Sequence, residues 1–209
     1  AGMNLTNYYG VSVSRDGRWL EVASSEGTEP RNDLWIADLT ASAPSCPSFE
    51  LVQGDVDAQT SLTFGRDGRA YIFTDRDAPR GMLLVTTPGS WDPTSWRTLI
   101  PEAQDAVLDS VTLLDGEGLD QDQLLVVHTH HGVAQMAVHA ASGGEFPYPI
   151  ELPGAGTIGG PIEHIDGGPI TWIVYTDHTT IPTIYEFDAR SRKLTLYATS
   201  PGSVQAPSV

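Results

Sequence analysis

The chain has 209 residues, of which 40% are hydrophobic, so it can bury a core and does not have the composition of a disordered chain. Its 27 acidic and 11 basic residues give a net charge of −16, which makes nucleic acids and anionic membranes poor partners. No run approaches the roughly 18 to 20 apolar residues of a membrane helix. The first ten residues also lack the basic and then apolar pattern of a signal peptide. With one cysteine, Cys46, the chain cannot form an internal disulfide, which fits a reducing, cytoplasmic location.

Short runs rich in Val, Ile, Leu, Thr and aromatic residues follow one another along the chain, and Gly or Pro residues separate them. Such runs predict β-strands. The first half of the chain has eight of them, at 10–14, 19–24, 33–38, 49–52, 61–64, 70–74, 82–86 and 96–100. The second half has eight more, at 108–114, 123–129, 134–139, 148–152, 157–165, 171–176, 183–188 and 193–199.

One segment allows a second interpretation. Val107, Leu108, Val111 and Leu114 are spaced as on a helix, in a stretch without Gly or Pro. The register of the neighbouring strands favours a strand here, and we predict one.

The sequence repeats itself at a spacing of 51 residues, because Ser-Arg-Asp-Gly-Arg at 14–18 recurs as Gly-Arg-Asp-Gly-Arg at 65–69. In both copies an alternating run precedes the Asp-Gly pair and an aromatic-bearing run follows it, which predicts a tight hairpin. Extending this register divides the chain into four units of four strands, at about 8–54, 58–102, 107–153 and 157–201.

Repeats of about 40 to 50 residues with four strands each are typical of propeller blades. The predicted fold is therefore all-β: a single β-propeller domain over residues 1–209, built of four consecutive four-stranded antiparallel blades. Blades are stable only when their faces are covered by neighbours. A partial ring of four would either close on itself or expose apolar blade faces, and we expect self-association through such faces.

Four segments narrow the assignment further: YGVSVSRDGRWL at 9–20, NDLWIADL at 32–39, TDRDAPR at 74–80 and WRTLIPE at 96–102. In order and spacing they resemble the prolyl oligopeptidase family of serine peptidases, and the resemblance extends over about 8–204. It implies a seven-bladed propeller that covers an α/β-hydrolase domain. This chain resembles the last four blades, without the hydrolase domain and its catalytic residues.

The resemblance also implies a function. The propeller of this family restricts access to the active site, so that short, unstructured, proline-containing peptides enter. By this comparison the chain would be a non-catalytic gating domain whose partner is the α/β-hydrolase domain of the full-length protein. Two alternatives remain: a stand-alone interaction scaffold, and a small propeller glycosidase with Asp109 and Glu163 as its carboxylates.

The residues themselves predict no catalytic centre and no cofactor. The sequence contains no Gly-x-Ser-x-Gly, the turn that carries the nucleophile of an α/β-hydrolase. Residues 154–159 match Gly-x-Gly-x-x-Gly, but Gly160-Pro161 follows where a dinucleotide site needs a helix. We therefore interpret this segment as a linker between blades.

Two clusters contain residue types that can bind metals, and neither predicts a metal site. His128 and His130 share one face of a predicted strand and His131 opposes them, without a third ligand at a suitable spacing. The acidic loop formed by Asp115, Glu117, Asp120 and Asp122 lacks the glycine and terminal glutamate of an EF-hand.

Arg80 is the one predicted substrate contact. The family carries an arginine on the strand after the corresponding hairpin, and here Met82 stands near that place, with Arg80 two residues away. The alternative is that Arg76 and Arg80 pair with Asp75 or Asp77. Among the tryptophans, Trp19, Trp35, Trp96 and Trp172 are expected in the cores between blades, whereas Trp91 lies in a loop, where it could stack on a carbohydrate.

Overall fold

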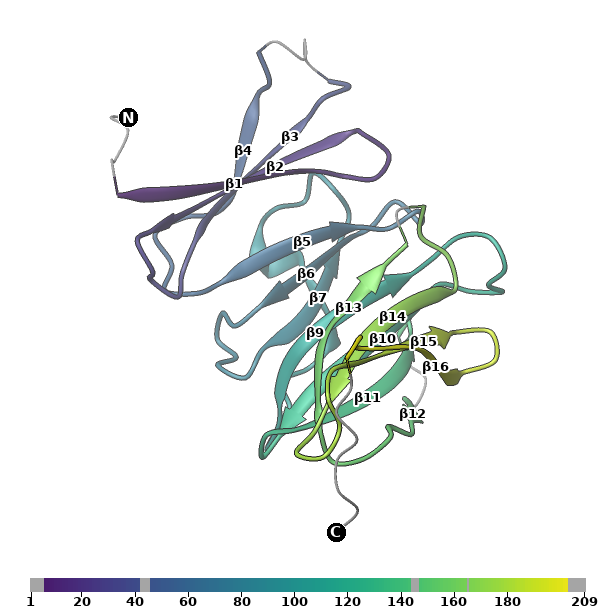
Figure 1. The fold of residues 1–209 in the computed structure, drawn as a ribbon. Coiled ribbons are helices and arrows are strands. Elements are labelled where there is room, and N and C mark those ends of the chain that lie inside the picture. Colours follow the sequence, from purple (N-terminus) through teal and green to yellow (C-terminus); the bar gives the residue numbers. More distant parts are fainter. Residues whose placement is uncertain (1–5, 42–45, 144–146, 165, 203–209) are drawn as a thin grey trace. The chain divides into compact units, whose positions relative to one another are not determined.

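The computed structural model describes residues 6–41, 46–143, 147–164 and 166–202, and within these ranges it confirms an all-β propeller fold (Figure 1). Sixteen strands form four sheets of four, each with its strands in sequence order and antiparallel. The only helical element in this part of the chain is one turn of 3₁₀ helix, and no helix here is long and apolar enough to cross a membrane. The chain divides into two compact units, residues 1–102 and 103–209, with two sheets in each.

The first unit contains blades 1 and 2. Blade 1 consists of β1 (Asn7–Val13), β2 (Trp19–Glu26), β3 (Asp33–Asp38) and β4 (Phe49–Gln53). Blade 2 consists of β5 (Thr60–Phe64), β6 (Ala70–Thr74), β7 (Met82–Thr86) and β8 (Arg97–Ile100), with the 3₁₀ turn at Pro93–Ser95 before β8. Both repeated Asp-Gly motifs are hairpin turns, as predicted. Gly17 and Gly68 have φ values of 74° and 76°, a conformation that glycine adopts without strain.

Aromatic rings form the centre of the core between blades 1 and 2. The ring of Trp19 on β2 stacks on Phe64 of β5, with centroids 5.5 Å apart, and Trp91 contacts both rings edge-on. Trp91 is 6% exposed, so the loop tryptophan is a core residue and does not present a surface for a sugar. Trp96 is half-buried and packs against this core, as predicted, whereas Trp35 is half-buried and lies outside it, although strand patterning predicted it in a core.

A buried polar network also joins the two blades. Asn32 and Thr60 exchange two hydrogen bonds, from Asn32 Nδ2 to the Thr60 carbonyl and from Thr60 N to Asn32 Oδ1, at 2.9 and 2.7 Å. Gln53 Nε2 donates to the carbonyls of Asn32 and Ala58, both at 3.0 Å, and Gln53 Oε1 accepts from the Thr60 hydroxyl at 2.9 Å. Because these groups are buried and bonded to one another, the network specifies how the blades meet.

The second unit contains blades 3 and 4. Blade 3 consists of β9 (Val107–Leu114), β10 (Gln123–His130), β11 (Val133–Ala140) and β12 (Tyr148–Ile150). Blade 4 consists of β13 (Thr157–Glu163), β14 (Ile170–Thr176), β15 (Thr183–Asp188) and β16 (Lys193–Thr199). The segment with helical spacing is therefore strand β9. The strands predicted at 148–152 and 157–165 end earlier, at Ile150 and Glu163, and Ile165 lies outside the described residues.

Aliphatic side chains dominate the core of the second unit. Leu125 and Val127 of β10 pack with Ile173 of β14 and Phe187 of β15, and all four are at most 1% exposed. Trp172, which was expected in this core, alternates with Ile173 on β14 and is half-buried. Its ring contacts His164 and Tyr197.

Candidate functional site

The hairpin between β6 and β7 carries Arg80, the predicted substrate contact. The turn is built from hydrogen bonds of Ala78 N to the Asp75 carbonyl (3.0 Å) and Gly81 N to the Ala78 carbonyl (2.7 Å), and the Ala78 side chain is buried. Glu102 fixes the end of this turn, since its Oε1 accepts from Arg80 N at 2.8 Å and lies 3.7 Å from the Arg80 Nε.

The arginine pairing differs in part from the sequence interpretation. Arg76 Nε lies 3.9 Å from Asp77 Oδ2, which is the predicted kind of pair within the turn. Arg80 instead contacts Glu102, from the end of blade 2. The Arg80 side chain is 42% exposed, so it combines an ion pair with access to solvent. Whether it contacts a substrate remains a prediction.

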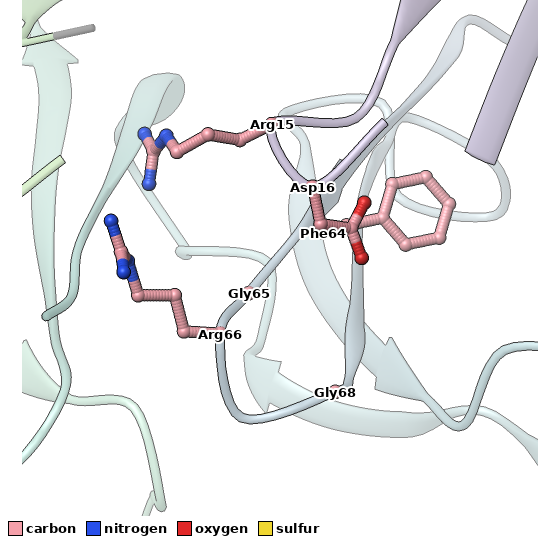
Figure 2. Close-up of a pocket in the computed structure, with 6 residues that line it drawn as sticks. All are labelled: Arg15, Asp16, Phe64, Gly65, Arg66 and Gly68. Carbon is pink, nitrogen blue, oxygen red and sulfur yellow. The ribbon is translucent and has the colours of Figure 1, made fainter. Parts of the chain in front are cut away.

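The opposite end of the same blades carries a pocket that the sequence interpretation missed. Successive hairpins of an antiparallel sheet alternate between its two ends, so the β1–β2 and β5–β6 turns lie at the other end from the Arg80 hairpin. Between these turns is a pocket of about 420 Å³ (Figure 2), which we call the arginine pocket. It is lined by Arg15, Asp16, Phe64, Gly65, Arg66 and Gly68.

The two arginines of each repeated motif have different surroundings. The second arginine of each copy is bound within its own blade: Arg18 pairs with Asp38 at 2.7 Å, and Arg69 pairs with Asp67 at 2.6 Å. The first arginines, Arg15 and Arg66, are exposed and line the pocket. The repeated motif predicted the two turns, but its spacing in the sequence did not show that Arg15 and Arg66 line one cavity.

Hydrogen bonds keep the carboxylate of Asp16 ionised beside this pocket. The Ser14 hydroxyl and the Arg18 amide donate to it, and together they hold its pKa below the usual value although partial burial opposes them. In Figure 2 this carboxylate points toward Phe64, whereas the guanidinium groups of Arg15 and Arg66 extend to the other side. The Asp16 carboxylate therefore stabilises the turn, whereas the guanidinium groups of Arg15 and Arg66 are directed away from it.

The histidines of blade 3 do not form a metal centre. His130 Nε2 lies 3.4 Å from Asp105 Oδ2, and its ring contacts His131, which adopts a positive φ at the hairpin. Burial lowers the pKa of both His128 and His139, and the charge of His128 lowers the pKa of His139 further. Among the described residues, no group of three or more His, Cys, Asp or Glu side chains could hold a metal ion.

The acidic loop and the glycine-rich motif are structural features. Asp115 is buried, and its carbonyl accepts a hydrogen bond from Gly168 N at 2.7 Å. Residues after the Gly-x-Gly-x-x-Gly match form strand β13 and no helix, so the geometry that holds a dinucleotide is missing from this part of the chain. A Cβ at Gly156 would lie 2.4 Å from the Thr176 carbonyl oxygen, so close packing explains that glycine.

The carboxylates proposed for the glycosidase alternative lie on the first strands of their blades. Asp109 is on β9 and Glu163 is on β13, and both are exposed. Burial raises the pKa of Glu21, which is on β2 in the other unit, where the Ser12 hydroxyl donates to it.

The face of blade 1 that points away from blade 2 presents a row of apolar side chains. Cross-strand pairing places Val11 opposite Val22, Val22 opposite Trp35, and Trp35 opposite Leu51, so all four share one face of the sheet. Val11 and Leu51 are 68% and 57% exposed, and Val22 and Trp35 are half-buried. This outer row explains the position of Trp35, because Leu34 and Ile36 on either side of it face the core.

Comparison with known proteins agrees with this architecture. The family model described as "Prolyl oligopeptidase, N-terminal beta-propeller domain" matches residues 3–200, nearly the whole chain. The chain belongs to this family. The prolyl-oligopeptidase propeller predicted from the motifs of blades 1 and 2 is thereby confirmed.

The relatives are much longer proteins than this chain. The prolyl endopeptidases of Elizabethkingia miricola and Elizabethkingia meningoseptica are 27% and 25% identical to it, and each match covers 91% of this chain but 25% of the relative. A solved prolyl endopeptidase structure superimposes with a TM-score of 0.79 at 25% identity, over 93% of this chain and 26% of that one. Prolyl oligopeptidase B from Galerina marginata shares the fold with a TM-score of 0.78 at 18% identity, over 93% of this chain and 27% of that one. The chain thus spans about a quarter of the length of the relatives it matches.

Proposed function

We propose that this chain is the substrate-access part of a prolyl-oligopeptidase-type serine peptidase and acts together with an α/β-hydrolase domain. The observation that carries the proposal is the family match over residues 3–200, in a sequence that contains no Gly-x-Ser-x-Gly nucleophile turn. The chain supplies propeller blades, and the bond-breaking residues belong to the partner domain. The proposed location is the cytoplasm.

The blades would contribute to catalysis by excluding bulk water and folded proteins from the active site. Closing a cavity over an active site removes bulk water and strengthens the electrostatic interactions inside it. Rigid four-stranded blades with fully buried cores form a wall that folded proteins cannot pass, whereas an extended proline-containing peptide can. In this proposal Arg80, held by Glu102 at the end of blade 2, reaches the peptide from the propeller side.

A chimera tests this proposal. The matched quarter of the Elizabethkingia miricola prolyl endopeptidase is replaced by this chain, and kcat/KM is measured for a short fluorogenic Gly-Pro substrate and for a proline-containing peptide of about 40 residues. We expect the chimera to cleave the short substrate and to discriminate against the long one as the parent does, and the chain alone to cleave neither. Saturable turnover by the chain alone, abolished by a point substitution, would show that it is an enzyme and refute the proposal.

The same chimera tests Arg80. Arg80→Gln removes the guanidinium but keeps a polar side chain, and we expect KM for the short substrate to rise severalfold while kcat changes little. Arg97→Gln, on exposed strand β8, is the matched control with the same loss of charge. Equal effects of the two substitutions would exclude a substrate contact at Arg80.

The outer row of blade 1 is a candidate contact surface for a further blade in the longer protein. Where nothing covers it, the exposed apolar side chains favour pairing of two copies. Val11→Lys combined with Leu51→Lys places charges in the row, and light scattering should then show monomers in place of dimers. Thr98→Lys, at an exposed position of β8, is the control and should leave the dimers intact. A wild-type chain that is monomeric at high concentration would refute the pairing.

A further inference from the structure

The arginine pocket brings two positive charges together in a strongly acidic chain. Arg15 and Arg66 come from equivalent positions of the repeated hairpin turns, and both line the same cavity (Figure 2). Only 11 of the 209 residues are Lys or Arg against 27 acidic residues, so two arginines on one pocket, beside the single aspartate Asp16, are a local concentration of positive charge.

From this arrangement we infer that the arginine pocket binds the carboxylate of a peptide, either its C-terminus or an Asp or Glu side chain. Guanidinium groups bind carboxylates through charge-assisted, often bidentate hydrogen bonds. Each guanidinium has five N–H donors, so Arg15 and Arg66 can bind a ligand while keeping contacts within the protein. The inference rests on the proposed function in one respect, which is that peptides are the molecules this chain meets.

The size of the pocket favours a peptide over a small inorganic anion. Phe64 also lines the pocket, although in Figure 2 its ring lies on the other side from the two guanidinium groups and stacks on Trp19 at 5.5 Å. A cavity of about 420 Å³ is within the usual range for small-molecule sites and has room for an amino-acid side chain beside the carboxylate. Phosphate would contact the arginines but would fill only part of this cavity.

The turns that carry the arginines are held in place by their own hydrogen bonds. In each turn the second arginine is bound by an aspartate, Asp38 or Asp67, and the glycine of the Asp-Gly pair adopts a positive φ. Both turns also close through a backbone bond, from Gly17 N to the Ser14 carbonyl and from Gly68 N to the Gly65 carbonyl, at 2.8 and 3.0 Å. The backbone at Arg15 and Arg66 is therefore fixed before a ligand arrives, which reduces the entropy lost on binding.

The test measures binding to the full 209-residue chain, without any peptidase. The probe is the tetrapeptide Gly-Pro-Phe-Glu with a free C-terminus, and its partner is Gly-Pro-Phe-Gln with a C-terminal amide. Chemical-shift changes of the arginine Nε–Hε groups and of the Phe64 amide are followed as each peptide is added at 50 mM salt. A third titration uses inorganic phosphate.

We expect the acidic tetrapeptide to shift the Arg15 and Arg66 signals saturably and the amidated peptide to bind at least tenfold more weakly. Arg15→Gln and Arg66→Gln should each weaken binding about tenfold, while Arg97→Gln should have no effect. Raising the salt to 500 mM should weaken binding severalfold, because the ion pairs are exposed to solvent. Arg15→Lys and Arg66→Lys keep the charge without the planar donors, so an intermediate loss is expected from these more conservative variants.

Three results would overturn the inference: equal binding of the amidated peptide, saturation by phosphate without saturation by the acidic peptide, or unchanged affinity in both glutamine variants. Because this experiment involves no hydrolase domain, its failure would leave the access function intact. Conversely, failure of the chimera with a positive titration would separate a peptide-binding site from the peptidase assignment.

Discussion

Replacing Trp19 with alanine tests the aromatic core between blades 1 and 2. Trp19 is 8% exposed, and a tryptophan buries roughly 150 to 250 Å². At about 25 cal/mol per Å², this area corresponds to roughly 4 to 6 kcal/mol. The stacked contact with Phe64 and the edge contact with Trp91 would be lost as well. Relaxation of the cavity recovers part of this energy, so we expect the free energy of unfolding to fall by about 3 to 5 kcal/mol.

The measurement is urea unfolding followed by far-UV circular dichroism, together with hydrogen exchange to locate the loss. For a chain of this size, the expected loss lowers the melting temperature by roughly 6 to 20 °C. Amides of β2 and β5 should lose protection, since both strands supply rings to this core. Trp35→Ala is the matched control, and its loss should be clearly smaller because Trp35 lies in the half-covered outer row. A loss below 1 kcal/mol for Trp19→Ala, or a larger loss for Trp35→Ala, would refute this account of the core.

Three further predictions concern the polar network, a glycine and the acid limb of stability. Gln53→Leu removes the Nε2 donor from the buried carbonyl of Asn32, and the free energy of unfolding in urea should fall by roughly 1 to 3 kcal/mol. Gln59→Leu, at an exposed position, is the control and should change stability little. Gly156→Ala should lower the melting temperature strongly, because its Cβ would lie 2.4 Å from the Thr176 carbonyl oxygen. Gly160→Ala is the control and should not lower it, because no atom lies within 4 Å of a Cβ there. Similar effects of the two substitutions would contradict the packing argument. The Arg18 and Thr40 donors lower the pKa of Asp38, and the Tyr175 hydroxyl with the amide of Thr179 lowers that of Asp177. The stability that these two ionised carboxylates contribute is therefore fully present above the unfolded pKa of about 3.9 and is lost as pH falls through the lower folded pKa values. In Asp38→Asn, the melting temperature should therefore fall less steeply with decreasing pH, in melts recorded between pH 2 and 6.

The sequence was sufficient to predict the sheets because strand periodicity and turn chemistry are local properties. The Asp-Gly pairs at 16–17 and 67–68 fixed two hairpins and, through their spacing, the register of the repeat. That register also resolved the ambiguous segment 107–114 as a strand, although its apolar spacing is helical. Apolar spacing alone would have assigned this segment to a helix, because it does not take account of pairing with the neighbouring strands.

Which face of a blade is covered could not be predicted, because it depends on what lies beside the blade. Trp35 and Leu34 are consecutive apolar residues of one strand, yet Leu34 is fully buried and Trp35 is not. Trp91 lies in a loop without strand periodicity, and its burial depends on Trp19, 72 positions earlier in the sequence. The arginine pocket was missed for the same reason, since only packing brings the turns at Arg15 and Arg66 to one cavity.

The repeat also distinguishes the residues that build the two turns from the two arginines that line the arginine pocket. Within each Arg-Asp-Gly-Arg turn, the aspartate, the glycine and the second arginine are committed to folding by hydrogen bonds, backbone conformation and ion pairs. The first arginine of each turn lines the pocket, so substituting it changes the pocket. Two turns of adjacent blades then place two such variable positions on one cavity. A pocket of this kind can change its charge one residue at a time, whereas a pocket built from the strands would have to change the core as well.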